Sequence, residues 1–312
     1  MTIPWRIVYF GTPEFARPTL SAIAGSDDEV VAVVCQPDRP QGRGRKMAPP
    51  PIKVLAQELN LPVWQPEKMQ DPDTISRLKA YKPDLLVVVA FGQILPQAAL
   101  HLAPHGALNL HPSLLPAHRG PAPINWAILK GDDQTGVTTM LLDEGVDTGP
   151  ILLAQGENIG PDETAGDLHD RLAIIGAELI LRTISGMKTG TVTPKPQDDS
   201  KASRGRLLTK QDGLIDWTRP AVELSRQVRG LDPWPGAFTS FGGKNLKLFG
   251  ANVGTGRGNP GQVLAVQDGH LHIATGDGSL GLKELQLAGK NRQSAMVFWH
   301  GQRLSQNDFF GR

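Results

Sequence analysis

The chain has 312 residues, of which 39% are hydrophobic and 20% charged, and its formal net charge is +1. These values suit a soluble globular protein of one large or two ordinary domains. The single cysteine, Cys35, excludes an intrachain disulfide framework and a cysteine-rich zinc site, and it suits a reducing cytoplasm. No apolar stretch approaches the ~20 residues that span a membrane. Because the first strand pattern begins close to the first methionine, we expect no targeting segment.

The first half of the chain alternates apolar, β-branched runs with segments of helical periodicity. Residues 85–90 (LLVVVA) have no polar alternation, which is typical of a strand buried on both faces. The alternation predicts an α/β fold with a mostly parallel sheet and helices on both faces. We expect strands at 5–10, 29–35, 84–90, 106–110, 136–142 and 151–154, and helices near 13–25, 51–60, 71–81, 95–102, 122–131 and 162–187.

The composition changes after about residue 188. Residues 189–206 are rich in Thr, Pro, Lys, Asp and Ser, which indicates a linker between a first domain at 1–188 and a second at 207–312. Short strand patterns separated by glycines predict a small β-barrel in the second domain. The second domain is mildly basic, which permits a polyanionic partner. We expect a helix at 219–229 and strands at 237–241, 244–253, 261–266, 270–275 and 281–287.

Two polar side chains mark the end of the strand expected at 106–110. Asn109 and His111 are two residues apart, so they lie on the same face of a strand. Ligands of open α/β sheets bind beyond the carboxyl ends of the strands. There, an amide and an imidazole can hold an oxyanion and transfer a proton. The alternative is a histidine that only satisfies a structural hydrogen bond.

A carboxylate-rich turn, 143–149 (DEGVDTG), follows the strand expected at 136–142. It is either an ordinary Asx turn or the source of a carboxylate that meets His111. In the second case, we expect the pKa of His111 to rise above its usual ~6.5. Asp147 is the best candidate because it lies between glycines. The spacing of an EF-hand is absent, which argues against calcium.

Four cations, Arg39, Arg43, Arg45 and Lys46, occupy a long loop after the second strand. Loops of this length are usually functional or disordered. Without aromatic residues the loop suits phosphates better than stacked bases. The alternative is a solvated run of charge.

Residues 90–96 (AFGQILP) follow the buried strand at 84–90 and offer apolar side chains for a planar ligand. Core packing explains them equally well. No glycine-rich dinucleotide fingerprint, P-loop or nucleophile elbow follows any expected strand.

In combination, these residues resemble the 10-formyltetrahydrofolate-dependent formyltransferases. The resemblance rests on Asn109, His111, 113–116 (SLLP), Arg119-Gly120, Pro123 and 143–149. Pro112 takes a position that is often glycine in the family. Further segments are similar to the branch of the family that acts on methionyl initiator tRNA: 11–13, 36–44, 215–217, 233–236 and 274–278.

The resemblance implies a Rossmann-like catalytic domain and a smaller, OB-like tRNA-binding domain. It implies that Asn109, His111 and Asp147 are catalytic and that no metal takes part. It places the tRNA acceptor stem on Arg39, Arg43, Arg45 and Lys46. The implied folate pocket contains Val89, Ala90, Phe91, Gly92, Ile94, Leu95, Ser113, Leu114, Leu115, Pro116, Asp143 and Gly145.

We therefore expect formyl transfer from 10-formyltetrahydrofolate to methionyl initiator tRNA. Asn109 and a protonated His111 are expected to stabilise the oxyanion. The expected enzyme is a monomer in the bacterial cytoplasm. Two other acceptors stay open, glycinamide ribonucleotide and an amino sugar nucleotide; the C-terminal domain argues against the first and the basic loop against the second. Two further alternatives are a hydrolase that releases formate and a non-catalytic tRNA-binding module. Binding alone, however, would not need Asn109, His111 and Asp147.

Overall fold

The computed structural model of the protein describes residues 3–41, 44 and 46–311. The chain forms two compact units, and each is assembled from three segments. The first unit comprises Met1–Gly120, Thr135–Glu157 and His169–Arg204, and the second comprises Pro121–Gln134, Asn158–Leu168 and Gly205–Arg312. The domain boundaries expected from composition, at 188 and 206, remain a prediction.

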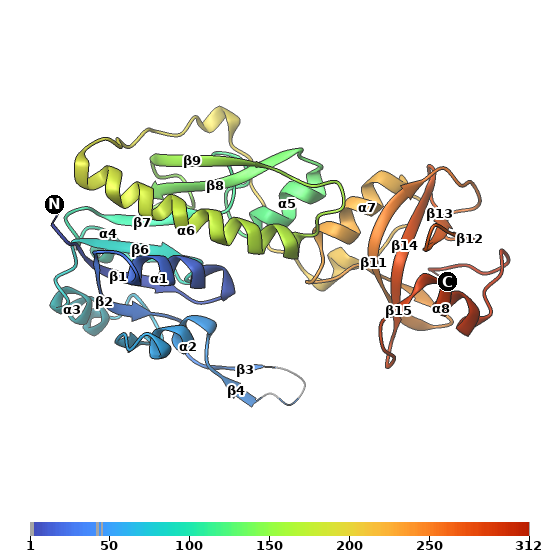
Figure 1. Ribbon diagram of the computed structural model, residues 1–312, viewed down its shortest axis with the longest axis horizontal. Helices are drawn as coiled ribbons and strands as arrows, with labels where there is room; N and C mark the ends of the chain where they lie inside the picture. The colour runs from blue at the N-terminus through green and yellow to red at the C-terminus, as the bar shows by residue number, and fades with distance from the viewer. Residues whose placement is uncertain (1–2, 42–43, 45, 312) are drawn as a thin grey trace. The chain divides into compact units, whose positions relative to one another are not determined.

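The first unit is built on a seven-stranded sheet with the order β5-β2-β1-β6-β7-β8-β9 (Figure 1). The pairs β1–β2, β2–β5, β1–β6 and β6–β7 are parallel, whereas β7–β8 is antiparallel. This confirms the predicted, mostly parallel sheet. The strands are β1 (Arg6–Gly11), β2 (Glu29–Val34), β5 (Val63–Trp64), β6 (Leu85–Val89), β7 (Ala107–His111), β8 (Gln134–Leu141) and β9 (Ile151–Asn158).

Helices cover both faces of this sheet because successive strand residues point to opposite sides. Val8 of β1 packs in one apolar cluster with Leu78 of α3 and Leu100 of α4. On the opposite face, the Tyr9 hydroxyl donates to the carbonyl of Ala16, directly before α1. The helices up to residue 189 are η1 (Glu14–Ala16), α1 (Arg17–Ala24), α2 (Pro51–Glu58), α3 (Pro72–Ala80), α4 (Gln97–Leu100), α5 (Pro123–Lys130) and α6 (Ala165–Thr189), of which α5 belongs to the second unit.

The segment predicted as a long basic loop contains a short antiparallel ribbon instead. Strand β3 (Arg39–Gln41) pairs with β4 (Lys46–Ala48). Its base is anchored by Asp38, which accepts hydrogen bonds from the Lys53 ammonium at 2.9 Å and from the Gln65 amide at 2.8 Å. These bonds to the charged form lower the pKa of the Asp38 carboxyl. Regular backbone pairing therefore holds part of a segment whose composition indicated only a loop.

The C-terminal region carries a six-stranded antiparallel sheet with the path β10-β11-β14-β13-β12, in which β15 also pairs with β14. Trp217, Leu282, Phe298 and Phe310 belong to its buried core. The apolar residues of the last helix lie on all of its faces, so its sequence shows no helical period that would predict it. The elements of the C-terminal region are η3 (Lys210–Gly213), α7 (Ala221–Gly230), β10 (Phe238–Phe241), β11 (Lys244–Gly254), β12 (Val263–Gln267), β13 (His270–Ala274), β14 (Ser279–Leu287), β15 (Gln293–Ser294) and α8 (Ala295–Gln302), whereas η2 (Asp199–Lys201) belongs to the first unit.

The polar segment that follows α6 is not a free tether. Lys195 and Ile151 of β9 exchange two backbone hydrogen bonds of 2.8 Å, and η2 follows four residues later. Residues up to Arg204 belong to the first unit. Within the described ranges, no helix has both the length and the apolar character needed to cross a lipid bilayer.

Candidate active site

Strand β7 places Asn109 and His111 on one face, at its carboxyl end. Leu110 points to the other face, where its side chain fills the space beside Gly176 of α6: a Cβ atom on Gly176 would lie 2.5 Å from Leu110 Cδ2. The direction of the two polar side chains is thus fixed by the packing of the residue between them. Asn109 is only 9% exposed, and the His111 imidazole is 7% exposed. Electrostatic interactions are strong in such a site because little water screens them.

Asp147 reaches the same site from the turn after β8. Its backbone has φ +55°, a left-handed conformation that is uncommon outside glycine but several-fold enriched for Asp. The turn is tight, since a Cβ atom on Gly149 would lie 1.8 Å from the carbonyl oxygen of Leu141. Asp147 Oδ2 lies 3.6 Å from His111 Nδ1 and accepts a 2.7 Å hydrogen bond from the Gly120 N–H. Strand β8 ends beside Leu108, near the start of β7, and the turn that follows returns Asp147 to the carboxyl end of β7, where Asn109 and His111 lie.

Oxygen atoms face both ring nitrogens of His111. Nε2 lies 3.0 Å from the carbonyl oxygen of His118, and Nδ1 faces Asp147. Burial nevertheless lowers the pKa of His111 below its usual value, and the nearby Asp147 charge and the His118 carbonyl only partly oppose this effect. The expectation of a raised pKa was therefore wrong. The free-energy cost of removing the imidazolium from water exceeds the stabilisation that these two partners give it.

The Asn109 carboxamide makes no hydrogen bond to any other residue in the described ranges. Its N–H groups are thus available to a ligand oxygen beside His111. A buried amide that is not engaged within the protein is the kind of donor that stabilises a developing oxyanion.

The loop after β7 is held by its own polar groups. The Ser113 hydroxyl donates to the carbonyl of Ala117 at 2.6 Å, and the Thr138 hydroxyl of β8 donates to the carbonyl of Ser113 at 2.6 Å. Thr138 Oγ1 in turn accepts from the N–H of Leu115. Of the predicted folate residues in this loop, Ser113 and Leu115 are buried, whereas Leu114 and Pro116 are half-buried.

The segment after β6 divides into buried and exposed positions. Val89, Phe91 and Leu95 are buried in the sheet and the adjoining core, whereas Ala90, Gly92 and Ile94 are exposed, with Ile94 at 76%. The carbonyl of Phe91 accepts from the Thr12 hydroxyl at 2.8 Å, which ties together the ends of β6 and β1. Of these six predicted pocket residues, the three exposed ones are thus available to a ligand, and the three buried ones pack beneath them.

The same segment meets the turn that carries Asp147. The Gln97 amide of α4 donates to the Glu144 carboxylate at 2.6 Å. Asp143 Oδ1 is occupied within the turn, where it accepts from the N–H of Gly145 and the hydroxyl of Thr148. The predicted pocket residues Asp143 and Gly145 therefore shape this turn.

Sequence reasoning missed Gln197, which lies in the segment whose composition indicates a linker. Its amide nitrogen donates to the carbonyl oxygens of Asp147, at 2.9 Å, and Gly149, at 2.8 Å. No sequence signal marks Gln197, because it lies fifty positions from Asp147 in a segment of ordinary polar composition.

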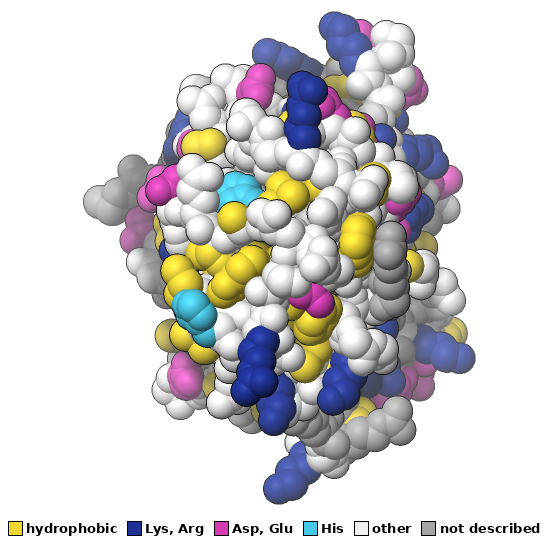
Figure 2. Space-filling view, turned by 90° about the vertical axis from the view of Figure 1, so that its right-hand side faces the viewer, with side chains coloured by type: hydrophobic (Ala, Val, Ile, Leu, Met, Phe, Trp, Pro, Cys, Tyr) yellow, Lys and Arg dark blue, Asp and Glu magenta, His cyan; other side chains and the backbone are white. Residues whose placement is uncertain are grey.

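Arg39 and Lys46 are exposed on the β3–β4 ribbon. Arg43 and Arg45, the other two residues predicted to meet tRNA, lie outside the described residues. Figure 2 shows one face of the molecule, on which Lys and Arg side chains stand at several separate places with apolar side chains between them.

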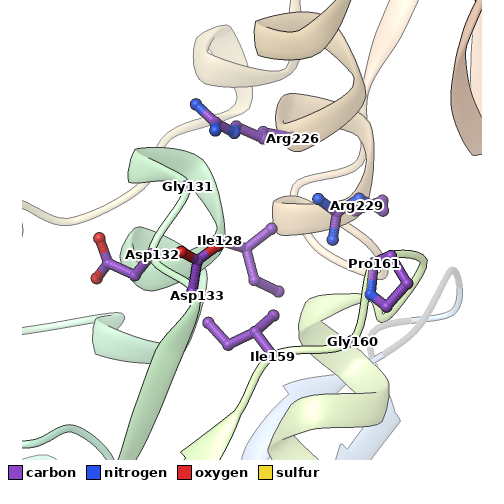
Figure 3. A pocket seen from close by; sticks show the side chains of 9 residues that line it. All are labelled: Ile128, Gly131, Asp132, Asp133, Ile159, Gly160, Pro161, Arg226 and Arg229. Atoms are coloured by element: carbon purple, nitrogen blue, oxygen red, sulfur yellow. The ribbon is translucent and has the colours of Figure 1, made fainter.

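A pocket of about 110 Å³ lies in the second unit, and none of the predicted site residues lines it (Figure 3). Arg226 and Arg229 enter it from α7, with two aspartates from the segment that follows α5. No group of three or more His, Cys, Asp or Glu residues suited to a metal ion occurs in the described part of the chain. The pocket is lined by Ile128, Gly131, Asp132, Asp133, Ile159, Gly160, Pro161, Arg226 and Arg229.

Comparison with known proteins identifies two family matches. The family model described as Formyl transferase matches residues 5–184, and that described as Formyl transferase, C-terminal domain, matches residues 207–303. The methionyl-tRNA formyltransferase of Trichlorobacter lovleyi is 50% identical over 301 residues, which cover 96% of this chain and 95% of that protein. The protein of the same name from Geobacter metallireducens is 48% identical over 298 residues, with 96% of each chain covered.

Among solved structures, HypX from Aquifex aeolicus in complex with tetrahydrofolic acid has a TM-score of 0.63 at 20% identity. The match covers 95% of this chain but only 47% of HypX, so the chain spans about half the length of that protein. The sugar 3N-formyl transferase WlaRD has a TM-score of 0.65 at 18% identity, with 93% of this chain and all of WlaRD covered. At such identities these similarities show the fold alone.

Proposed function

The chain belongs to the formyl transferase family, and from this premise we propose that it transfers the formyl group of 10-formyltetrahydrofolate to the amino group of methionyl initiator tRNA. The observation that carries the proposal is the trio of Asn109, His111 and Asp147, formed by the carboxyl end of β7 and the turn that follows β8. Relatives named methionyl-tRNA formyltransferase match 96% of the chain, which supports the acceptor. The tetrahydrofolate complex of HypX supports a folate donor.

Asn109 stabilises the oxyanion of the reaction. The neutral amine of the aminoacyl group attacks the formyl carbon, and the carbonyl oxygen becomes negatively charged in a tetrahedral intermediate. Asn109 donates its amide N–H to this oxygen. Loss of one such donor typically costs about 10²–10³ in rate.

His111 moves the proton. Because burial lowers its pKa, the resting imidazole is neutral. Since Nε2 faces a carbonyl oxygen, which can only accept, Nε2 carries the hydrogen and Nδ1 accepts the proton of the attacking amine. The resulting imidazolium is held by Asp147 and by the carbonyl of His118. It then gives the proton to N10 of the folate as the bond between N10 and the formyl carbon breaks. A neutral resting histidine thus replaces the protonated one that the sequence predicts.

Two groups of residues bind the substrates. Exposed and half-buried positions around the trio, including Ala90, Gly92, Ile94 and Leu114, receive the folate. The phosphates of the tRNA attract cations, as does the charged tail of the folate. The basic segment with Arg39, Arg43, Arg45 and Lys46 engages the tRNA backbone. We further propose a monomer in the bacterial cytoplasm, with a catalytic domain at 1–188, a linker at 189–206 and a tRNA-binding, OB-like domain at 207–312.

Formyl transfer assays with three acceptors test this proposal. Wild type and His111→Ala are given 10-formyltetrahydrofolate and either methionyl initiator tRNA, glycinamide ribonucleotide or an amino sugar nucleotide. We expect product only with the tRNA, and formed about 10²–10⁴ times more slowly by His111→Ala than by wild type. Transfer to a small acceptor instead would overturn the acceptor, and equal rates for both proteins would overturn the role of His111.

A further inference from the structure

The position of Asp147 depends on hydrogen bonds to its backbone as well as to its carboxylate. Its left-handed backbone places the Asp147 carbonyl and the Gly149 carbonyl near one another. One amide group, that of Gln197, donates to both. A primary amide has two N–H bonds, so both carbonyls are satisfied by this single side chain.

Arg119 fixes the orientation of that amide. Its Nε and Nη2 atoms donate to Gln197 Oε1 at 3.0 and 2.8 Å. A guanidinium can only donate, so the oxygen of the amide must face Arg119 and the nitrogen must face Asp147. Arg119 is itself only 4% exposed, and its backbone N–H donates to the carbonyl of Ser203. The planar fork thus holds Gln197 in one rotamer inside a packed environment.

The dipeptide Arg119-Gly120 therefore reaches Asp147 by two routes. Gly120 donates its N–H to the carboxylate, at Oδ2, and Arg119 acts through Gln197 on the backbone of the turn. Both routes end on the residue whose carboxylate faces His111 Nδ1 at 3.6 Å. The segment that follows α6 is consequently part of the site.

We propose that Gln197 and Arg119 are positioning residues that hold the Asp147 carboxylate against His111. The inference rests on the proposed function for its kinetic consequence, but its structural part concerns only this chain. Without the Gln197 hydrogen bonds, Asp147 no longer supports the imidazolium that forms when the amine is deprotonated. A displacement of about 1 Å in such a site can cost about 10²-fold in rate.

Gln197→Glu is the primary test, because it keeps the shape of the side chain and its interaction with Arg119 but places an oxygen against two carbonyls. We expect kcat to fall about 10²-fold, with the KM for the folate and for the tRNA little changed. Gln197→Ala, which removes both donors without adding a charge, is the second variant. Gln155→Glu on β9 is the matched control, because Gln155 lies in the same unit and its side chain bonds only to Glu157 and Arg182 within the described chain.

A titration of His111 by NMR, without substrates, separates positioning from simple stabilisation. Since the Asp147 charge raises the pKa of His111, we expect the midpoint to move to lower pH in Gln197→Ala, which adds no charge, but not in Gln155→Glu. A wild-type midpoint in Gln197→Ala would overturn the inference. This readout is independent of activity, so it still tests the positioning role if the acceptor assays overturn the proposed function.

A double-mutant cycle is the second test of whether Gln197 acts through Asp147. If Gln197 acts through Asp147, Gln197→Ala should lower kcat little further in an Asp147→Asn background. Fully additive reductions in kcat would show that Gln197 acts by another route and would overturn the inference.

Discussion

The site at the carboxyl end of β7, with the turn that follows β8, and the β3–β4 ribbon are both rich in functional candidates, but they differ in burial and in hydrogen bonding. At the first, His111 and Asp147 are buried or half-buried and each is held by neighbouring groups. On the second, Arg39 and Lys46 are exposed. Chemistry at a carbonyl carbon requires groups fixed at one position in little water, whereas attraction of a phosphate backbone requires charge near the surface.

The contrast predicts two kinds of kinetic effect. Changes at the strand ends should lower kcat, because they remove interactions that act in the transition state. Changes on the ribbon should weaken tRNA binding in a salt-dependent manner, because they remove screened charge interactions.

We expect the largest effect from Asp147→Asn. The amide keeps the size of the side chain but removes the negative charge that opposes the imidazolium. The rate of transfer should fall by about 10²–10⁴, the range for loss of positioned acid–base catalysis. Steady-state kinetics with saturating tRNA check this, and thermal unfolding controls for the fold. A variant within twofold of wild type would contradict the role of Asp147.

The pH dependence should follow His111. Its pKa is lowered, so the neutral form is present at pH 7 and disappears as the pH falls through a value below ~6.5. The kcat/KM of wild type should therefore be flat near neutral pH and fall about tenfold per pH unit on the acid side. In Asp147→Asn this limb should move to lower pH. An acid limb centred clearly above 6.5 would show that the partners of His111 outweigh its burial.

A smaller effect is expected from the double substitution Arg39→Ala with Lys46→Ala. The KM for tRNA should rise several-fold at low salt, while kcat and the KM for the folate stay unchanged. The slope of log affinity against log salt should decrease by about one for each phosphate that no longer meets a cation. Filter binding across a salt series measures this. An unchanged slope would mean that other parts of the protein bind the tRNA.

We expect the smallest effect from Lys53→Met, at the base of the ribbon. The Lys53–Asp38 pair is partly exposed, and such pairs contribute about 0–1 kcal/mol. The free energy of unfolding should thus fall by less than about 1 kcal/mol. Denaturant unfolding measures it, with Lys68→Met as the control, because Lys68 forms no ion pair within the described part of the chain. A decrease of several kcal/mol would show that the ribbon is coupled to the core.

Local patterns made part of this site accessible to prediction. Asn109 and His111 could be identified because a strand has a period of two, and Asp147 because glycines flank its turn. Gln197 could not, since only tertiary folding brings residue 197 to residue 147. The direction of the His111 pKa was wrong for a related reason: the sequence shows the nearby charge but not the depth of burial. Most of the strands and helices were predicted to within a few residues, whereas β3, β4 and β5 are too short to show a period.

The central claim is that His111 and its partners carry the chemistry and that the β3–β4 ribbon binds tRNA. The most direct test is to measure tRNA affinity and the single-turnover transfer rate on the same His111→Ala protein, beside the Arg39→Ala and Lys46→Ala double variant. We predict that His111→Ala binds methionyl initiator tRNA as wild type does but transfers formyl about 10²–10⁴ times more slowly. The ribbon variant should show weaker binding and a normal rate once saturated. A His111→Ala protein that binds tRNA poorly and keeps its saturated rate would contradict the account.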